Sequence, residues 1–188
     1  MKNILIIGGT KGIGKSIVDN LVDDNNITCL SRNKLDFQHQ NFIHKEFDAL
    51  SDEYPEMDSL DCLIYCPGSI NLKPISTLTL EDFRNDFEIN VIGAVKAIKK
   101  YLPILKKSLS ASILLFSTVA TKLGMPYHAS VSVAKSGIDG LVKTLGSKLA
   151  PKVRINAIAP TITNTDLASK ILRNEKVIEN MIKPFEQK

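Results

Sequence analysis

Short apolar runs alternate with longer amphipathic stretches along this chain. The short runs are consecutive hydrophobic residues, a pattern typical of strands that are buried on both faces of a sheet. They lie at residues 4–7, 27–30, 42–44, 62–65, 112–116 and 153–158. The longer stretches carry hydrophobic residues at helical spacing and predict helices over residues 14–21, 80–107, 129–149 and 166–182.

Two residues mark the limits of the longest helical stretch. Thr79 is a suitable N-cap for a helix that begins at Leu80. Pro103 has no backbone N–H, and it is therefore expected to bend or end the same helix.

The alternation of strands and helices predicts one α/β domain over residues 1–188. Right-handed crossovers between successive strands give a doubly wound parallel sheet, the Rossmann fold, with six strands and helices on both faces. Ligands of such sheets bind at the carboxyl ends of the strands. Candidate site residues are therefore expected directly after the predicted strands.

Composition and charge are those of an ordinary globular protein, with 44% hydrophobic and 23% charged residues. The net charge of +4 is spread along the sequence, so nucleic-acid binding is not expected. No apolar run approaches the length of a membrane span, and no signal peptide precedes the first strand, so we expect a cytoplasmic protein. Cys29, Cys62 and Cys66 lack metal-ligand spacing and are interpreted as buried reduced thiols.

A glycine-rich segment follows the first predicted strand and opens the first predicted helix. Its sequence is Gly8-Gly9-Thr10-Lys11-Gly12-Ile13-Gly14-Lys15-Ser16. Glycine lets the backbone approach a phosphate closely, and the N–H groups at a helix N-terminus favour an anion. The segment therefore predicts a phosphate-binding site.

This segment fits two nucleotide-binding spacings. Residues 9–16 match the mononucleotide P-loop pattern G-x-x-x-x-G-K-[ST], which also needs an acidic residue after another strand to hold Mg²⁺. The later strands end in Leu30-Ser31, Cys66-Pro67, Ser117-Thr118 and Ala159-Pro160, without an acidic residue, which disfavours an NTPase. The alternative spacing is Gly8-x-x-x-Gly12-x-Gly14.

The second spacing resembles the glycine loop of the short-chain dehydrogenase/reductase family, T-G-x-x-x-G-x-G, and the resemblance covers nearly the whole chain. Asp48 follows the third strand, where the family has an Asp that contacts adenine. Tyr65-Cys66-Pro67-Gly68 stands in place of the family's N-N-A-G and keeps only the glycine. Asn90-Val91-Ile92-Gly93 matches the family's N-x-x-G, Thr118 stands in place of its active-site Ser, and Lys135 matches the Lys of its Y-x-x-x-K. The segment from Asn156 to Thr165 resembles the family's N-x-x-x-P-G-x-x-x-T: Pro160 and Thr165 match, and Thr161 replaces the Gly.

The resemblance implies an activity and a set of site residues. The activity is oxidation or reduction of a small alcohol or carbonyl compound, with Thr118 polarising the substrate oxygen, Asn90 supporting a proton relay and Lys135 holding the nicotinamide ribose. The family's paired helices, here 80–107 and 129–149, imply a homodimer or homotetramer. The implied coenzyme-binding residues are Gly8, Thr10, Lys11, Gly12, Ile13, Gly14, Ser31, Arg32, Asp48, Ala49, Cys66, Pro67, Gly68, Asn90, Lys135, Pro160, Ile162 and Thr165.

The residues after the second strand predict which coenzyme binds. An NAD enzyme places an acidic residue there, which bonds the ribose 2′-hydroxyl. Here the sequence is Ser31-Arg32, and Lys11 adds a second cation beside the glycine loop. Because two cations favour a 2′-phosphate, we expect NADP(H) rather than NAD(H).

The family's proton-transferring tyrosine has no counterpart at its expected place. The position four residues before Lys135 is Val131, which has no ionisable proton. Three hypotheses stay open: Tyr127 or His128 supplies the proton, a water held by Lys135 acts with Thr118, or the chain binds NADP(H) without turnover as a sensor or scaffold. Asn90, Thr118 and Lys135 all persist, which favours the enzyme.

The C-terminal part of the sequence is short for this family. Members usually continue with a substrate-covering helix and a seventh strand, whereas this sequence ends at Lys188. The sixth strand is therefore expected at an open edge of the sheet, which is a surface that can pair with another chain.

Overall fold

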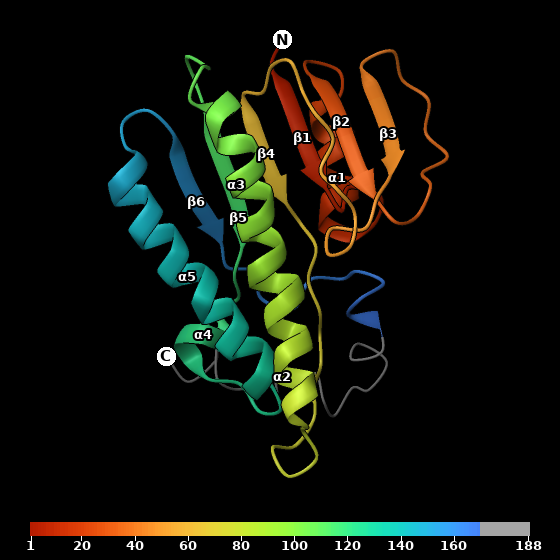
Figure 1. Cartoon of the computed structure of the whole chain (residues 1–188). Coiled ribbons are helices and arrows are strands. Elements are labelled where there is room, and N and C mark those ends of the chain that lie inside the picture. Colours follow the sequence, from red (N-terminus) through yellow and green to blue (C-terminus); the bar gives the residue numbers. More distant parts are fainter. Residues whose placement is uncertain (170–188) are drawn as a thin grey trace.

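A six-stranded parallel sheet forms the centre of the structure, a computed structural model (Figure 1). Its strands are β1 (Asn3–Ile7), β2 (Asn26–Ser31), β3 (Phe42–Glu46), β4 (Cys62–Tyr65), β5 (Ser112–Phe116) and β6 (Arg154–Ile158). They lie in the order β3-β2-β1-β4-β5-β6, and every neighbouring pair is parallel. The predicted doubly wound sheet of six strands is confirmed.

The structure describes residues 1–169. Within them β6 lies at one edge of the sheet, and Ile158 at its end is 48% exposed. Residues 166–168 form a turn. Of the helix predicted at 166–182, residues 170–182 lie outside the described residues. Among the helices of residues 1–169, none combines the length and the hydrophobicity needed to cross a bilayer.

The strand order reverses at β1, which pairs with β2 on one side and with β4 on the other. Both ladders continue one step past the strands: Gly8 N donates to Leu30 O at 2.8 Å, and Cys66 N donates to Ile7 O at 2.9 Å. The loops that follow β1 and β4 therefore start side by side at the carboxyl edge of the sheet, where ligands of this fold bind.

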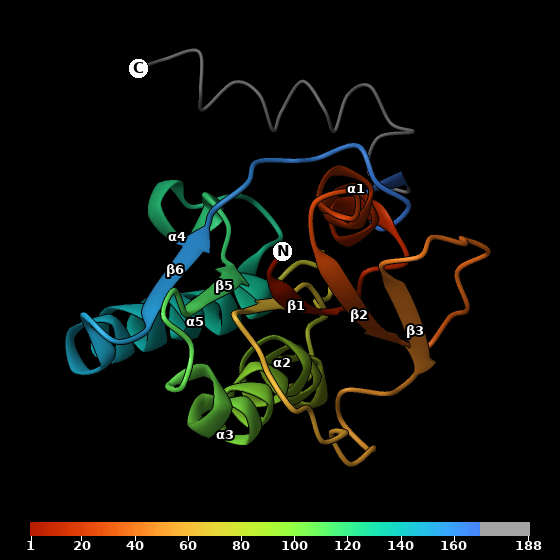
Figure 2. The ribbon, with the colours of Figure 1, turned by 90° about the horizontal axis from the view of Figure 1, so that it is seen from above.

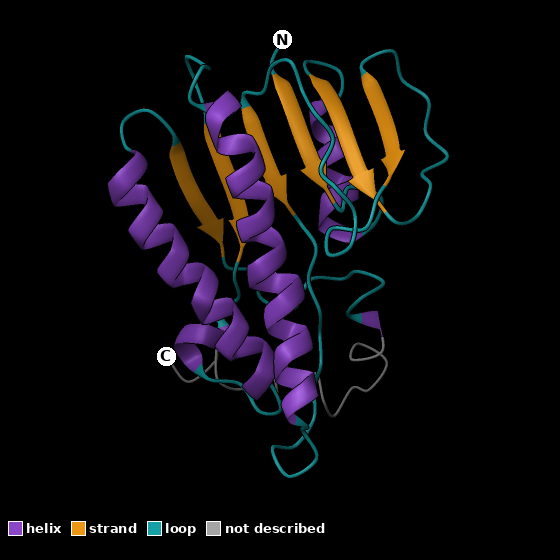
Figure 3. Cartoon of the chain, in the orientation of Figure 1, coloured by secondary structure: helices purple, strands orange, loops and turns teal. Residues whose placement is uncertain are grey.

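Helices cover both faces of the sheet (Figures 2 and 3). One face carries α1 (Gly12–Leu21), and the other carries α2 (Leu80–Phe87), α3 (Gly93–Leu105) and α5 (Ala129–Leu149). Side chains of β1 alternate accordingly: Leu5 and Ile7 belong to the core with α3 and α5, whereas Ile4 and Ile6 pack with Val18 of α1. Both cores hold the loops of the carboxyl edge in place.

Three helical details differ from the predictions. α1 begins at Gly12, two residues before the predicted start, because the helix extends into the glycine loop. The short helix α4 (Ala120–Leu123) was not predicted, since four residues carry no periodic pattern. The stretch predicted at 80–107 is divided by a π-helical turn, η1 (Glu88–Ile92), and it ends at Leu105.

The predicted N-cap Thr79 is confirmed. Its hydroxyl accepts from Asp82 N at 3.1 Å, and the Asp82 carboxylate accepts from Thr79 N at 2.9 Å. The two contacts form a capping box, which satisfies backbone donors that have no partner inside the helix. Pro103 lies in the last turn of α3.

Tyr65, the last residue of β4, braces the π-helical turn. The Gly93 N–H donates to Glu88 O, five residues back, instead of Ile89 O. The Ile89 carbonyl instead accepts from the buried Tyr65 hydroxyl at 2.8 Å. A Cβ at position 93 would overlap that hydroxyl, so the absence of a side chain at Gly93 allows the contact.

Replacing Tyr65 with Phe is expected to lower the free energy of unfolding by about 0.5–1.5 kcal/mol, because the half-buried Ile89 carbonyl loses its donor. Urea denaturation followed by circular dichroism measures the change. Tyr127→Phe is the control: its hydroxyl makes no hydrogen bond within residues 1–169, so its effect stays below about 0.5 kcal/mol. Equal stability of Tyr65→Phe and the parent chain would contradict the bracing role.

Candidate coenzyme-binding and active site

The glycine-rich loop between β1 and α1 is tightly wound. Gly8 and Gly12 have φ of +77° and +52°, in the left-handed region that favours glycine. A Cβ at Gly14 would overlap the carbonyl oxygen of Gly8. The N-cap of α1 is Lys11, whose side chain forms no capping hydrogen bond. The N–H groups of the first turn therefore stay available to an anion.

Lys15, on which the P-loop alternative depends, is turned along α1. Its ammonium forms an ion pair with Asp19 at 2.6 Å, one turn further on, and lies 5.4 Å from the centroid of the Phe37 ring. A P-loop lysine must instead reach back to the phosphates. This geometry does not support an NTPase.

A hollow of about 180 Å³ lies at the carboxyl ends of β1 and β2. The predicted coenzyme-binding residues on its walls are Gly8, Thr10, Lys11, Ser31, Arg32, Asp48, Ala49, Pro67 and Gly68. We call it the Arg32 hollow. Lys11 and Arg32 are both exposed, whereas the Asp48 carboxylate accepts a hydrogen bond from Leu50 N at 2.8 Å. Within the described chain, the hollow therefore presents two cations and one carboxylate that is already engaged.

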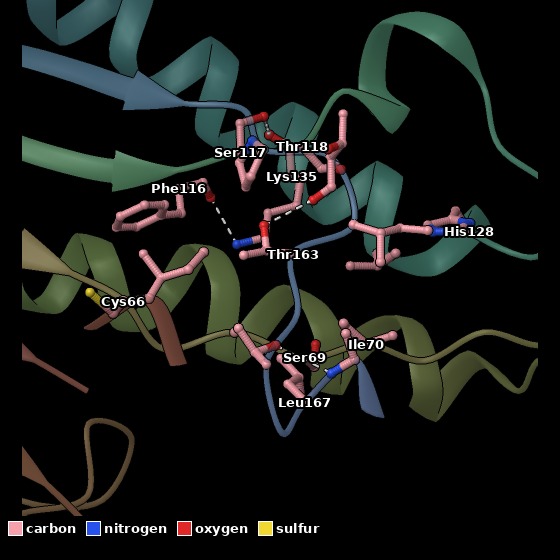
Figure 4. A pocket seen from close by; sticks show the side chains of 18 of the residues that line it. Cys66, Ser69, Ile70, Phe116, Ser117, Thr118, His128, Lys135, Thr163 and Leu167 are labelled. Atoms are coloured by element: carbon pink, nitrogen blue, oxygen red, sulfur yellow. Dashed lines mark hydrogen bonds between the residues drawn. The ribbon is translucent and has the colours of Figure 1, made fainter. Parts of the chain in front are cut away.

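A second hollow, of about 170 Å³, lies beyond the ends of β4 and β5, against α5 and the segment after β6 (Figure 4). The predicted site residues on its walls are Ile13, Cys66, Gly68, Thr118, His128, Lys135, Pro160, Ile162 and Thr165. We call it the Lys135 cavity. Gly68 lines both hollows, so they adjoin at this residue.

Lys135 is the charged group inside this cavity. Its side chain is 9% exposed, and Nζ donates to the carbonyl oxygen of Phe116 at 2.8 Å. Burial lowers the pKa of Lys135 to about 8, and the nearby Cys66 works weakly in the opposite direction. The same burial raises the pKa of the Cys66 thiol to about 12. Near neutral pH the cavity thus contains an ammonium group beside an unreactive thiol.

Asn90 lies behind Gly68, in the π-helical turn. Its Nδ2 donates to Asp86 O at 2.7 Å and to Ser69 Oγ at 3.0 Å, and Oδ1 has no partner within residues 1–169. A Cβ at Gly68 would lie 3.0 Å from Asn90 Oδ1 and 3.4 Å from Lys135 Nζ. The absence of a side chain at Gly68 therefore leaves room beside both polar atoms.

The remaining candidate catalytic residues divide between two places. Thr118 and His128 line the Lys135 cavity, and so does Val131, one turn before Lys135. His128 Nδ1 forms a hydrogen bond with Pro126 O at 2.7 Å. Tyr127 is 56% exposed with φ of +66°, and it lines a separate surface hollow. Of the two proposed replacement donors, only His128 is brought into the cavity.

Ser69 and Asp86 belong to this site although no motif points to them. Ser69 follows Gly68 and lines the Lys135 cavity, and its hydroxyl donates to Asp86 Oδ1 at 2.5 Å. Asp86 is 2% exposed and lies one helical turn before Asn90. The one available signal is an acidic residue on the face of the helix that also carries Asn90.

Comparison with known proteins identifies the family. A family model described as enoyl-(acyl carrier protein) reductase matches residues 9–185. The chain belongs to the short-chain dehydrogenase/reductase family. Membership of this family identifies the chain as an oxidoreductase of the NAD(P)-dependent type.

Relatives in this family share about a quarter of their residues with the chain. It is 25% identical to the 3-oxoacyl-[acyl-carrier-protein] reductase FabG of Buchnera aphidicola, over 93% of this chain and 78% of that protein. It is 29% identical to a tropinone reductase homolog of Datura stramonium, over 95% of this chain and 75% of that protein.

Solved structures show the same fold. ElxO with NADP bound matches with a TM-score of 0.81 and 26% identity, over 93% of this chain and 80% of ElxO. The aldohexose dehydrogenase of Thermoplasma acidophilum matches with a TM-score of 0.81 over 96% of this chain and 76% of that enzyme, and its 23% identity supports the fold alone.

Burial of Lys135 makes stability depend on pH in a defined window. Its pKa is about 8 in the folded chain and about 10.4 in an unfolded one. Between these values the unfolded chain holds the extra proton, so the free energy of unfolding rises with pH. Relative to Lys135→Met, the parent chain is expected to gain roughly 2–3 kcal/mol from pH 7 to pH 10.5.

Urea denaturation of both chains at several pH values measures this difference. Losses in Lys135→Met that do not depend on pH shift the whole curve, and the other titrating groups are common to both chains. A difference that stays flat across the window would contradict the lowered pKa.

Proposed function

We propose that this chain is an NADP(H)-dependent oxidoreductase that acts on a small alcohol or carbonyl compound, with Val131 in place of the active-site tyrosine. The observation that carries the proposal is the junction of the Arg32 hollow and the Lys135 cavity at Gly68. A two-nucleotide coenzyme would have its adenosine phosphate held by Lys11 and Arg32 and its nicotinamide ribose held by Lys135.

The residues at the junction fit such a coenzyme. The glycine loop offers N–H groups to a pyrophosphate. Gly68 leaves space beside the Lys135 ammonium and beside Asn90 Oδ1, which has no partner within residues 1–169. When bound, NADP(H) supplies or accepts the hydride. Thr118 would polarise the substrate oxygen from the cavity wall.

A preference for NADP(H) is supported by charge. Lys11 and Arg32 border the hollow, and among the described residues its one carboxylate, on Asp48, is engaged by a backbone N–H. A guanidinium pairs with a phosphate through parallel hydrogen bonds, which a 2′-hydroxyl cannot match. The similarity to ElxO, whose structure contains NADP, agrees with this preference.

The wall of the Lys135 cavity favours an apolar substrate. Ile70, Met125, Val131 and Leu167 contribute side chains to it, beside the hydroxyl groups of Ser69 and Thr118. Relatives are named for reactions on compounds of this class, including a cyclopentanol dehydrogenase from Comamonas testosteroni that is 24% identical. We therefore expect small, largely hydrophobic ketones or secondary alcohols.

Calorimetry with NADPH, followed by an assay of NADPH oxidation with a panel of aldehydes and ketones, tests the proposal. Coenzyme binding with turnover of at least one apolar carbonyl compound supports it. If a folded full-length chain takes up neither NADPH nor NADH, the coenzyme assignment is wrong.

The rival hypothesis is an NADP(H)-binding sensor or scaffold. It has one specific observation behind it, the aliphatic side chain of Val131 at the position one turn before Lys135. Binding without turnover in the parent chain, with turnover appearing in Val131→Tyr, would favour this rival. Turnover in the parent chain rejects it.

Replacing Arg32 with Ala is expected to weaken NADPH binding about tenfold to a hundredfold, because a charge-assisted contact to the 2′-phosphate is worth roughly 1.5–3 kcal/mol. Binding of NADH is expected to change less than about twofold. Calorimetry measures the dissociation constants for NADPH and for NADH. Lys34→Ala is the matched control, since Lys34 is an exposed cation two residues further on that does not line the hollow. Parallel losses for NADPH and NADH would argue against a 2′-phosphate contact.

A homodimer or homotetramer is proposed through the helices on one face. α2, α3 and α5 lie on the same side of the sheet, where Phe87 is 41% exposed and Val133 is 59% exposed. Large exposed apolar side chains on neighbouring helices suit an interface between copies.

Cys29, Cys62 and Cys66 are free thiols, in keeping with the cytoplasm that we expect.

A further inference from the structure

Ser69 and Asp86 form a hydrogen-bonded pair at the wall of the Lys135 cavity. Figure 4 draws Ser69 on the side of the cavity opposite Thr118. The Ser69 hydroxyl donates to Asp86 Oδ1 at 2.5 Å and accepts from Asn90 Nδ2 at 3.0 Å. One hydroxyl group thus connects the cavity with a carboxyl group that is packed inside the helical layer.

The surroundings of Asp86 do not suit a purely structural carboxylate. The residue is 2% exposed, and its Oδ2 has no hydrogen-bond partner within residues 1–169. Removing a carboxylate from water is costly unless its oxygens are hydrogen-bonded. The hydrogen bond from Ser69 gives this carboxyl group one route by which a proton can enter or leave it.

We propose that Asp86 and Ser69 transfer the proton of the reaction, with Ser69 as the catalytic residue that contacts the substrate oxygen. This inference rests on the proposed function and deepens it, because Val131 provides no proton at the expected place. The pair lies at the same cavity wall as Gly68, where the Arg32 hollow joins.

In the reducing direction, the substrate carbon receives the hydride and the electron pair of the C=O π bond moves to oxygen. That oxygen bonds the proton of Ser69, as the Ser69 O–H bond breaks. Ser69 Oγ then bonds the proton of Asp86, whose O–H bond breaks and leaves a carboxylate. The resulting arrangement, with Ser69 donating to Asp86 Oδ1, is the one that the structure contains.

The relay returns to its starting state after the product leaves. A solvent proton, which reaches the cavity as a hydronium ion, bonds Ser69 Oγ while the Ser69 O–H bond breaks and that proton bonds Asp86 Oδ1. A neutral water molecule is left behind. One proton and one hydride are consumed for each carbonyl group reduced, and oxidation of an alcohol follows the same steps in reverse.

Other proton donors in the cavity have competing contacts. Lys135 Nζ donates to Phe116 O, and its charge is needed where the oxygen becomes negative. His128 forms its hydrogen bond through Nδ1 to Pro126 O at the start of α5, and within residues 1–169 no carboxyl group is hydrogen-bonded to it. Ser69 is a hydroxyl on the cavity wall with a carboxyl group directly behind it.

The alternative role for the pair is structural. Ser69 and the Asp86 carbonyl both accept from Asn90 Nδ2, which fixes the orientation of that amide. A structural role predicts altered coenzyme binding and independent effects of the two side chains. A relay predicts normal binding and effects that do not add, because the two residues act as a unit.

The test compares Asp86→Asn, Ser69→Ala, the double variant and Ser69→Thr in the full chain. We expect each single variant to lower kcat about a hundredfold or more, and the double variant to lose no more than the worse single variant. Dissociation constants for NADPH, measured by calorimetry, stay within about twofold. Ser69→Thr, which keeps the hydroxyl, retains most of the activity.

Glu81→Gln is the matched control, because it removes an exposed carboxylate from the first turn of α2, outside both the capping box and the cavity. It is expected to leave kcat unchanged. A second readout does not depend on turnover. The infrared spectrum of the parent chain minus that of Asp86→Asn should contain the band of a protonated carboxyl group. This band should shift in D₂O and change in Ser69→Ala.

Three results would overturn the relay. These are full activity in folded Ser69→Ala or Asp86→Asn, losses that multiply in the double variant, and the absence of a protonated carboxyl band assigned to Asp86. A parent chain that binds NADPH but reduces no carbonyl compound also overturns it, while the coenzyme-binding part of the proposed function stands. Failure to bind coenzyme overturns both.

Discussion

The parallel pairing of β1 with β2 on one side and β4 on the other is the constraint on which the whole site depends. It brings the glycine loop and the loop of Gly68 and Ser69 to one edge of the sheet. The chain leaves β1 for one face and β4 for the other, so the covering helices diverge there and leave space. Both hollows occupy this space, and they meet at Gly68 because the β4 loop lies between them.

Features with a local cause could be predicted from the sequence, and features that need a distant partner could not. The six strands and the Thr79 capping box follow from runs and spacings of adjacent residues. The π-helical turn depends on a hydroxyl from Tyr65, 24 positions before Ile89. The Ser69–Asp86 contact joins residues 17 positions apart. Motifs placed Asn90, Thr118 and Lys135 near one another, but they carried no signal for the polar groups packed behind them.

The site concentrates groups that weaken the fold when no ligand is bound. Lys135 holds a charge at 9% exposure, and Asn90 Oδ1 and Asp86 Oδ2 have no partner within residues 1–169. Each is a cost to stability that apolar packing elsewhere must offset, because buried polar groups lose their hydration. Such costs are concentrated at functional sites, where groups are arranged for a ligand rather than for one another. The two sheet faces, filled by Leu, Ile and Val, provide the compensation.

The tyrosines of the chain are engaged away from the Lys135 cavity. Of the four, three donate to backbone carbonyls: Tyr54 to Ala49 and Gly93, Tyr65 to Ile89, and Tyr101 to Pro55. Tyr65 and Tyr101 are buried, and Tyr54 is half-buried. Burial raises the pKa of each of these three phenols well above its usual range, so they keep their protons. The fourth, Tyr127, lies on the surface, and none of the four lines the Lys135 cavity. Within residues 1–169 no phenol lines this cavity, and of the hydroxyl groups on its walls only that of Ser69 is hydrogen-bonded to a buried carboxyl group.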